Sequence, residues 1–336
     1  MISSVRCLGQ SALIAMAVMI CAIGVSFADE APSRERHIRF TYLTEIGPID
    51  PGAASVKVWI PLPRDDAFQR VGKVSVDSPV PGKIVDQNSQ GNRLIYFEAS
   101  KPLPSTLTIK ITADVTRLQE SADLGRAAVV RSESNDGRMA EYLQPDQLVP
   151  TTGRIATISA DLDDHSATPL EQARIIYEYV TAVMRYDKTG TGWGRGDAIY
   201  ACDVRRGNCT DFHSLFIALA RASGIPARFT IGFPLGSRQA DTIPGYHCWA
   251  EFYVGGQWIP VDASEAWKHP KRHEYYFGNL DADRVAFTMG RDLTLSPAQD
   301  GAPVNFLIYP LAQVDGRTLG KDQVKNKFEY SDLPRR

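Results

Sequence analysis

Hydrophobic and polar residues alternate in several short segments of the first third of the chain. Segments with this alternation are 38–43, 56–60 and 107–111, and residues 94–97 form a shorter apolar run. Alternation with a period of two predicts strands, and clusters of proline, glycine, aspartate and serine between them are typical of turns. Residues 36–118 are therefore predicted to form an antiparallel β-sandwich domain without catalytic groups.

The pattern changes to a helical period further along the chain. Residues 119–150 are mostly polar or irregular and are predicted to be a linker. Thr168 followed by Pro169 is typical of a helix start, and apolar residues at helical spacing follow. A catalytic α+β domain is predicted over 151–310, with residues 311–336 as a C-terminal extension. Strand-like pieces near the end of the chain are expected to add to the enzyme domain.

The first 28 residues have the pattern of a secretory signal peptide. Arg6 precedes an apolar run from Ala12 to Val25, and Ser26-Phe27-Ala28 provides small residues before a cleavage site. The run is shorter than the roughly 20 residues of a membrane-spanning helix, so an uncleaved anchor is the second choice. The mature protein is therefore expected to be periplasmic or secreted, with no membrane span after cleavage.

Composition and charge narrow the class of protein. Hydrophobic residues make up 43% and charged residues 23% of the 336 residues, as in ordinary globular proteins, and the formal net charge is -2. Since no basic stripe is present, no nucleic-acid partner is expected. Signal cleavage leaves Cys202, Cys209 and Cys248, an odd number, so at least one thiol is unpaired within the chain. A disulfide between Cys202 and Cys248 stays an open alternative.

Cys209 lies at the predicted start of a helix. Within residues 206–228, Asn208 is a good N-cap, and Gly224 followed by Pro226 is a good stop. Backbone N–H groups and the helix dipole favour the thiolate form of a cysteine in the first turn. The alternative is a buried structural cysteine, which we rank lower because a helix N-terminus is a poor place to bury a thiol.

A hairpin is predicted over residues 245–264, with Gly255-Gly256 as the turn. If Val254 pairs with Gln257, then His247 and Asp262 are diagonal neighbours on one sheet face, with Trp249 opposite Asp262. Their backbones would lie roughly 7–8 Å apart, which lets a carboxylate reach an imidazole. Such a histidine exchanges the thiol proton, and the aspartate orients its ring. Each residue alone has an ordinary structural explanation, but their joint occurrence with Cys209 favours catalysis.

The motifs in these two segments are similar to those of the transglutaminase-like superfamily. They read Gly-Asn-Cys-Thr-Asp-Phe, Tyr-His-Cys-Trp-Ala-Glu-Phe and Trp-Ile-Pro-Val-Asp. The strong resemblance covers about 206–262, and a weaker one extends over 169–309. The resemblance implies a papain-like transglutaminase core after the β-sandwich and a catalytic triad of Cys209, His247 and Asp262. It leaves the reaction open, because members of the superfamily crosslink, deamidate or hydrolyse amides, and some do no chemistry.

Three further residues are candidates for substrate contact: Trp193, His213 and Trp249. Trp193 lies in a glycine-rich loop, 190–197, which is predicted to be mobile. Three roles are open for its indole: lining an acyl pocket, donating a hydrogen bond to an oxyanion, or packing on the core. His213 is an alternative base, ranked below His247 because it lacks an evident orienting acid. A zinc site from Cys202, Cys209, His213 and Cys248 matches no common spacing, so neither a metal nor another cofactor is expected.

The sequence therefore predicts an exported thiol enzyme acting on peptide or glutamine-type amides through a thioester. Its expected partner is a protein or peptide substrate, and its oligomeric state is left open. Hydrolysis is preferred to crosslinking, because the resemblance implies calcium-dependent regulation for the crosslinking relatives and no acidic cluster suited to calcium is evident in this sequence. A crosslinking transglutaminase and a non-enzymatic binding or scaffold protein are the alternatives.

Overall fold

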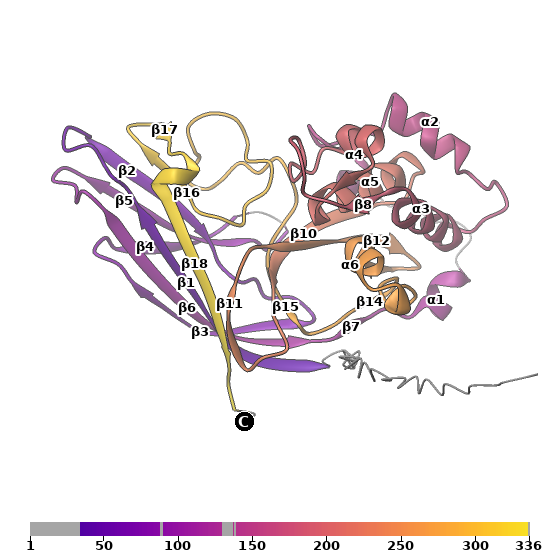
Figure 1. Ribbon diagram of the computed structural model, residues 1–336, viewed down its shortest axis with the longest axis horizontal. Helices are drawn as coiled ribbons and strands as arrows, with labels where there is room; N and C mark the ends of the chain where they lie inside the picture. The colour runs from indigo at the N-terminus through magenta and orange to yellow at the C-terminus, as the bar shows by residue number, and fades with distance from the viewer. Residues whose placement is uncertain (1–33, 88–89, 130–136, 138, 335–336) are drawn as a thin grey trace, which may run out of the picture. The chain divides into compact units, whose positions relative to one another are not determined.

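The computed structural model of the chain describes residues 34–87, 90–129, 137 and 139–334 (Figure 1). The predicted signal peptide, residues 1–28, lies outside the described residues, as does part of the predicted linker. The described residues belong to one compact unit. Among them, no helix combines the length and the apolar character that crossing a membrane requires.

Two five-stranded antiparallel sheets contain the strands predicted in the first third of the chain. One has the order β11-β18-β1-β6-β3 and the other β17-β16-β2-β5-β4. The N-terminal strands are β1 (Glu35–Ile46), β2 (Ser55–Pro61), β3 (Gln69–Asp77), β4 (Gly82–Asp86), β5 (Arg93–Ser100) and β6 (Leu107–Leu118). Buried and exposed residues alternate along β1 and β6, and the buried side chains of both sheets share one hydrophobic core. The expected antiparallel, sheet-rich region is confirmed.

The C-terminal strands pair with this N-terminal region. They are β16 (Leu311–Val314), β17 (Arg317–Thr318) and β18 (Val324–Asp332). β16 pairs with β2, and β18 lies between β1 and β11 (Ala240–Ile243), as Figure 1 shows. Phe328 of β18 packs its ring against Tyr42 at 4.5 Å and Phe233 at 4.4 Å. We expected such strands to extend the enzyme domain, but β16 pairs with β2, and β18 joins β1 of the N-terminal region to β11 of the predicted enzyme domain.

A mixed region of helices and sheet occupies the middle of the chain. Its four-stranded antiparallel sheet has the order β13-β12-β10-β15. The strands are β10 (Ala227–Pro234), β12 (His247–Val254), β13 (Gln257–Val261) and β15 (Arg284–Met289). The helices are α1 (Leu124–Ala128), α2 (Arg154–Asp161), α3 (Pro169–Val183), α4 (Ala198–Val204), α5 (Cys209–Ala222) and α6 (Ala263–Lys268). The predicted α+β class is confirmed, with this mixed region after a sheet-rich region.

Short elements connect these parts. They are β7 (Glu120–Ser121), β8 (Arg185–Tyr186), β9 (Arg206–Gly207), β14 (Asn279–Leu280) and the 3₁₀ turns Ala140–Leu143, Pro270–Arg272 and Lys321–Gln323. β7 pairs with β14, so the stretch expected to be a linker begins by joining the sheet region to the middle of the chain. Helix α3 starts with the Thr168 cap expected from the sequence, completed by Glu171 as a capping box.

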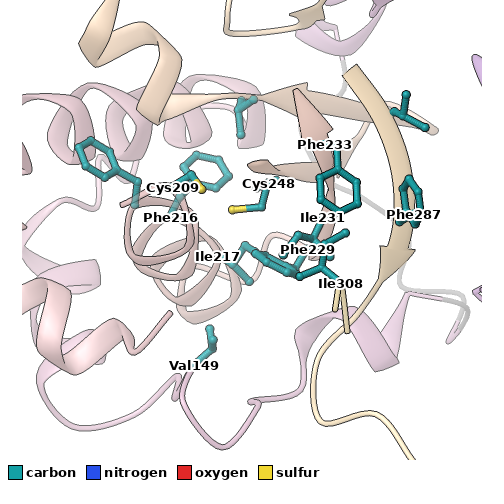
Figure 2. Close-up of a cluster of buried hydrophobic side chains, with 14 of the residues drawn as sticks. Val149, Cys209, Phe216, Ile217, Phe229, Ile231, Phe233, Cys248, Phe287 and Ile308 are labelled. Atoms are coloured by element: carbon teal, nitrogen blue, oxygen red, sulfur yellow. The ribbon is translucent and has the colours of Figure 1, made fainter. Parts of the chain in front are cut away.

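Helix α5 is the central element of the mixed region. It packs against β12 and β10 on one side and contacts α2, α3 and α4. Every residue from Cys209 to Arg221 is buried, and Phe216 contacts Phe252 of β12 with ring centroids 6.0 Å apart. Figure 2 shows Cys209, Phe216 and Ile217 of this helix among the buried side chains of the core. Because the helix is enclosed, its N-terminal residue is held in a fixed, mostly dry setting.

Candidate active site

Cys209 is the first residue of α5, and its neighbours fix the start of the helix. Oδ1 of Asn208 accepts a hydrogen bond from the backbone N–H of Thr210 at 3.0 Å. In return, Oδ2 of Asp211 accepts from the backbone N–H of Asn208 at 2.9 Å, which completes a capping box. Gly207 is needed here because a Cβ at this position would overlap the Asp211 carboxylate. The side chain of Cys209 is thereby held at the positive end of the helix, with 1% of its surface exposed.

The hairpin register brings His247 to Asp262. Val254 pairs with Gln257 and Ala250 with Val261, which is the register expected from a two-residue turn. Nε2 of His247 lies 2.6 Å from Oδ2 of Asp262. Since an ionised carboxylate only accepts, the imidazole donates through Nε2, and Nδ1 is left for exchange with Cys209.

Asp262 is held by more partners than His247. Its Oδ2 also accepts from Nη1 of Arg284 at 2.9 Å, while Oδ1 accepts from Oγ of Ser264 at 3.1 Å and from the backbone N–H of Glu265 at 3.0 Å. Asp262 therefore caps α6 and is paired with a buried guanidinium at the same time. Nη2 of Arg284 lies 3.3 Å from Asp281. Sequence reasoning missed Arg284, although an arginine directly before the apolar residues Val285, Ala286 and Phe287 is a usable signal.

The electrostatics of the three residues favour a charged pair. Burial disfavours the Cys209 thiolate, but hydrogen bonds from Cys248 and His247 and the imidazole charge outweigh it and hold the pKa of Cys209 well below its usual value. Burial disfavours the imidazolium of His247, but Asp262 and Cys209 outweigh it and raise the pKa of His247 to about 10. Burial also opposes ionisation of Asp262, yet His247, His213 and Arg284 hold its pKa well below the usual value. These directions favour a thiolate–imidazolium pair over a neutral thiol and imidazole at neutral pH.

His213 lies in the interior rather than at a substrate-facing surface. Its side chain is fully buried, with Nε2 3.5 Å from Oδ1 of Asp262 and Nδ1 3.5 Å from Sγ of Cys248. Sequence reasoning ranked it below His247 because no orienting acid was evident. The structure does place such an acid beside His213, because Asp262 lies near both imidazoles. The acid could not be assigned to His213 from the sequence, since the two are joined only by the packing of α5 on the hairpin.

The glycine-rich loop before α4 is held in place by buried charges, in contrast to the mobile loop that was expected. The carboxylate of Asp211 accepts from the backbone N–H groups of Gly194 at 2.7 Å and Gly196 at 3.1 Å. Nη2 of Arg291 donates to the carbonyl of Gly196 at 2.9 Å. The indole N–H of Trp193 donates to the carbonyl of Gly190 at 3.1 Å, so it is engaged within its own loop. Gly194 and Gly196 have φ of 81° and 64°, which explains the glycines.

A tyrosine is the polar neighbour of the Cys209 end of α5. Oη of Tyr246 accepts a hydrogen bond from Nδ2 of Asn208 at 3.0 Å, and a side-chain hydrogen bond also joins it to Thr210. Burial and then the negative charge of Cys209 raise the pKa of Tyr246, so the phenol stays protonated. The ring of Tyr246 lies 5.9 Å from that of Tyr309, which is 36% exposed. Sequence reasoning missed Tyr246, although it directly precedes the motif histidine.

Trp249 shares a sheet face with His247, as the alternation of the strand requires, and their rings lie 6.4 Å apart. It is 2% exposed, and the guanidinium of Arg284 lies 5.2 Å from its ring centre. On its other side Trp249 lines a cavity of about 290 Å³. The other residues around this cavity include Arg64, Arg117, Arg228, Glu120, Glu251 and Trp258. Neither Cys209 nor His247 lines it.

The three described cysteines are free thiols, and they do not lie in the one cluster of candidate metal ligands found among the described residues. Cys202, Cys209 and Cys248 are all free and buried. Within the described part of the chain, three candidate ligand atoms gather closely enough for a metal only at Glu178, His273 and Glu274. The four-residue zinc set weighed from the sequence is therefore not brought together.

Comparisons with known proteins agree with the fold and the motifs. Residues 156–263 match the model of the transglutaminase-like superfamily. An uncharacterized protein of Haemophilus influenzae is 29% identical over 313 residues, which cover 81% of this chain and 85% of that protein. An uncharacterized protein of Mycobacterium leprae is 26% identical over 163 residues, covering 46% of this chain and 56% of that protein.

A solved structure shares the fold along most of the chain. A crystal structure from Cytophaga hutchinsonii, named a putative cysteine protease, superposes with a TM-score of 0.64 at 18% identity. The alignment covers 91% of this chain and 93% of that chain, so it includes the sheet region as well as the mixed region. Together with the family match, these findings define an α+β protein with a transglutaminase-like core. The similarity to the transglutaminase-like superfamily lies in that core, over residues 156–263.

Proposed function

We propose that this protein is a thiol enzyme that cleaves peptide or glutamine-type amides through a thioester, with Cys209, His247 and Asp262 as its catalytic triad. The observation that carries the proposal is the 2.6 Å contact between Nε2 of His247 and Oδ2 of Asp262, made by a histidine that is also hydrogen-bonded to Cys209 at the start of α5. A merely structural histidine has no need of a thiolate partner. The lowered pKa of Cys209 and the raised pKa of His247 support the same assignment.

The reaction begins with attack of the Cys209 thiolate on the carbonyl carbon of the amide. The negative charge that develops on the carbonyl oxygen is stabilised by the backbone N–H of Cys209 at the helix start and by the phenolic O–H of Tyr246. Nδ1 of His247 then gives its proton to the leaving ammonia or amine, and a thioester remains on Cys209. Asp262 keeps the imidazole in the required orientation and stabilises its positive charge throughout.

Water or a primary amine resolves the thioester, with His247 now taking a proton from the attacking molecule. Hydrolysis by water makes the protein a peptidase or amidase, whereas attack by an amine makes it a crosslinking transglutaminase. We favour hydrolysis because no calcium-binding acidic cluster is evident in the sequence. The predicted signal peptide supports action in the periplasm or outside the cell, on a protein or peptide substrate.

The experiment that tests this proposal measures ammonia released from a pool of glutamine-containing peptides, with and without a primary amine. Wild type is compared with Cys209→Ala. Release that depends on Cys209, without amine incorporation, supports hydrolysis, and incorporation of the amine supports transamidation. If no ammonia is released, new peptide amino termini are measured, as the mark of a protease.

A non-enzymatic binding or scaffold role is the rival class of function. It predicts that Cys209 behaves as an ordinary buried thiol. Neither ammonia nor new amino termini from well-folded protein, together with slow alkylation of Cys209, would favour that role over catalysis.

A further inference from the structure

Cys248 is a second thiol beside the site, and the proposed acyl transfer does not use it. It is the second residue of β12 and is fully buried. A side-chain hydrogen bond joins it to Cys209. In Figure 2 the sulfur atoms of Cys209 and Cys248 point toward one another across the contact between α5 and β12.

Each of the two thiols has an imidazole of its own. Cys209 is hydrogen-bonded to His247, and Sγ of Cys248 lies 3.5 Å from Nδ1 of His213. Both imidazoles turn their Nε2 atoms to one carboxylate, because Asp262 lies 2.6 Å from His247 through Oδ2 and 3.5 Å from His213 through Oδ1. Acyl transfer requires only one thiol with one base. The second pair is therefore unexplained by that chemistry.

We propose that Cys209 and Cys248 form an oxidation site, a dithiol that hydroperoxides convert to a disulfide and that thiol reductants restore. The oxidant is hydrogen peroxide or a small alkyl hydroperoxide. This assignment goes beyond the proposed amide chemistry and does not depend on it.

The first step oxidises Cys209. Its thiolate attacks one oxygen of the hydroperoxide, so that an S–O bond forms and the O–O bond breaks. The sulfur loses two electrons and becomes a sulfenic acid, while the peroxide is reduced. The departing hydroxide, or the alkoxide of an alkyl hydroperoxide, takes the proton of the His247 imidazolium and leaves as water or as the alcohol.

The second step closes the disulfide. Cys248 passes its proton to Nδ1 of His213, and the resulting thiolate attacks the sulfur of Cys209. An S–S bond forms, the S–O bond breaks, and the departing hydroxide takes the proton from His213 to leave as a second water. In total, two thiols and one hydrogen peroxide give one disulfide and two waters.

The two thiols are suited to different steps. Cys209 is the thiolate of the pair, whereas burial and then the charge of Cys209 raise the pKa of Cys248, so Cys248 keeps its proton until His213 accepts it. Cys202, the remaining described cysteine, lies in α4, and burial raises its pKa to about 11. Cys202 is therefore a matched internal control, being a buried thiol of the same chain outside this arrangement.

The test maps the oxidised thiols by mass spectrometry after brief treatment of the folded full chain with hydrogen peroxide. Remaining thiols are blocked in denaturant before digestion with trypsin, which places Cys202, Cys209 and Cys248 in the separate peptides 196–205, 207–221 and 239–268. We expect a linked pair of 207–221 with 239–268, lighter by two hydrogen atoms than the separate peptides. Dithiothreitol should abolish the link and restore both thiols.

Variants separate this proposal from general oxidation. In Cys248→Ser and Cys248→Ala, Cys209 should accumulate irreversible sulfinic acid, at least about tenfold above wild type, because no thiol resolves its sulfenic acid. Cys202→Ser should form the same link as wild type. Circular dichroism shows whether each variant is folded, and the wild-type map stands on its own if a Cys248 variant is not.

Two results would overturn the proposal. One is sulfinic acid on Cys209 of folded wild type without a link to Cys248. The other is a link that joins Cys209 to Cys202 instead. Because peptide masses are measured rather than turnover, either result is distinguishable from a failure of the proposed amide chemistry.

Discussion

Arg284 donates through Nη1 to Oδ2 of Asp262 at 2.9 Å, and the same oxygen accepts from Nε2 of His247 at 2.6 Å. The carboxylate is fully buried, so its charge is neutralised by protein groups rather than by water. Arg284 fixes the aspartate that in turn fixes the histidine. Variants of these residues should therefore show two kinds of effect, one on the reactivity of Cys209 and one on the stability of the fold.

The reactivity of Cys209 should exceed that of an ordinary thiol at neutral pH. Iodoacetamide should alkylate it at a rate that falls only when the pH is well below the usual thiol pKa. In His247→Ala the rate at pH 7 should drop roughly 30-fold, because an ordinary thiol is only a few per cent ionised there. Labelled peptide 207–221 is the quantity to follow. Equal rates in both proteins would remove the basis for the ion pair.

The pH dependence of amide cleavage should differ from that of alkylation. Both need the thiolate, so both decline at low pH. Above pH about 10 His247 loses its proton, and the leaving amine is then no longer protonated. We therefore expect ammonia release to decline above that pH while alkylation continues undiminished. A parallel decline of both would instead indicate unfolding, which circular dichroism at the same pH detects.

Asp262→Asn tests the orienting role of the carboxylate. The amide oxygen keeps an acceptor for the backbone N–H of Glu265, so α6 should remain capped. The loss of charge should lower kcat by about 10⁴-fold, the magnitude typical of this change in a catalytic triad. Ser264→Ala is the matched control, because it removes one hydrogen bond to Asp262 without changing the charge. Its effect on kcat should be below about tenfold. Full activity in Asp262→Asn would refute the assignment.

Arg284→Met should destabilise the fold. It leaves the carboxylates of Asp262 and Asp281 buried without their guanidinium, which typically costs about 3–5 kcal/mol. Urea denaturation measures this change in the free energy of unfolding. Arg154→Met removes a pair with Asp203 whose side chains are 55% and 48% exposed, so its cost should stay within about 1 kcal/mol. Similar changes in the free energy of unfolding for both variants would show that the buried ion pairs of Arg284 stabilise the fold no more than an exposed pair does.

Asp211→Ala should release the glycine-rich loop. It deprives the backbone N–H groups of Asn208, Gly194 and Gly196 of their acceptor. Unsatisfied buried groups typically cost about 1–3 kcal/mol each, so hydrogen exchange at Gly194 and Gly196 should become faster and the fold less stable. Asp187→Ala is the control, because Asp187 accepts from Thr189 near the surface. Unchanged exchange at both glycines would mean that other contacts hold the loop.

Sequence reasoning was most successful where the relevant contacts are local. The turn at Gly255-Gly256 has two residues and strand side chains alternate, so the register of β12 and β13 followed from a few neighbouring positions. The start of α5 followed in the same way from Asn208, whose side chain caps its own helix. Neither inference needed any knowledge of distant parts of the chain.

The same reasoning was less successful where a distant residue decides the outcome. The glycines of loop 190–197 indicated mobility, but Asp211 and Arg291 hold that loop through buried hydrogen bonds. Strand-like pieces near the end of the chain were expected, but the sequence did not indicate that β18 would pair with β1. Glycine content and alternation describe what a backbone can adopt, whereas partners far along the chain select one of the conformations.

The sequence by itself determined the sheet-rich and α+β regions, the helix start at Cys209 and the sheet face shared by His247 and Asp262. These depend on periodicity, capping and turn length, which act over a few residues. Only the tertiary structure decided that Arg284 pairs with Asp262, that His213 shares this carboxylate and that Cys248 faces Cys209. These contacts join α5, β12, β15 and the cap of α6, and they form only when apolar faces of these elements are buried together.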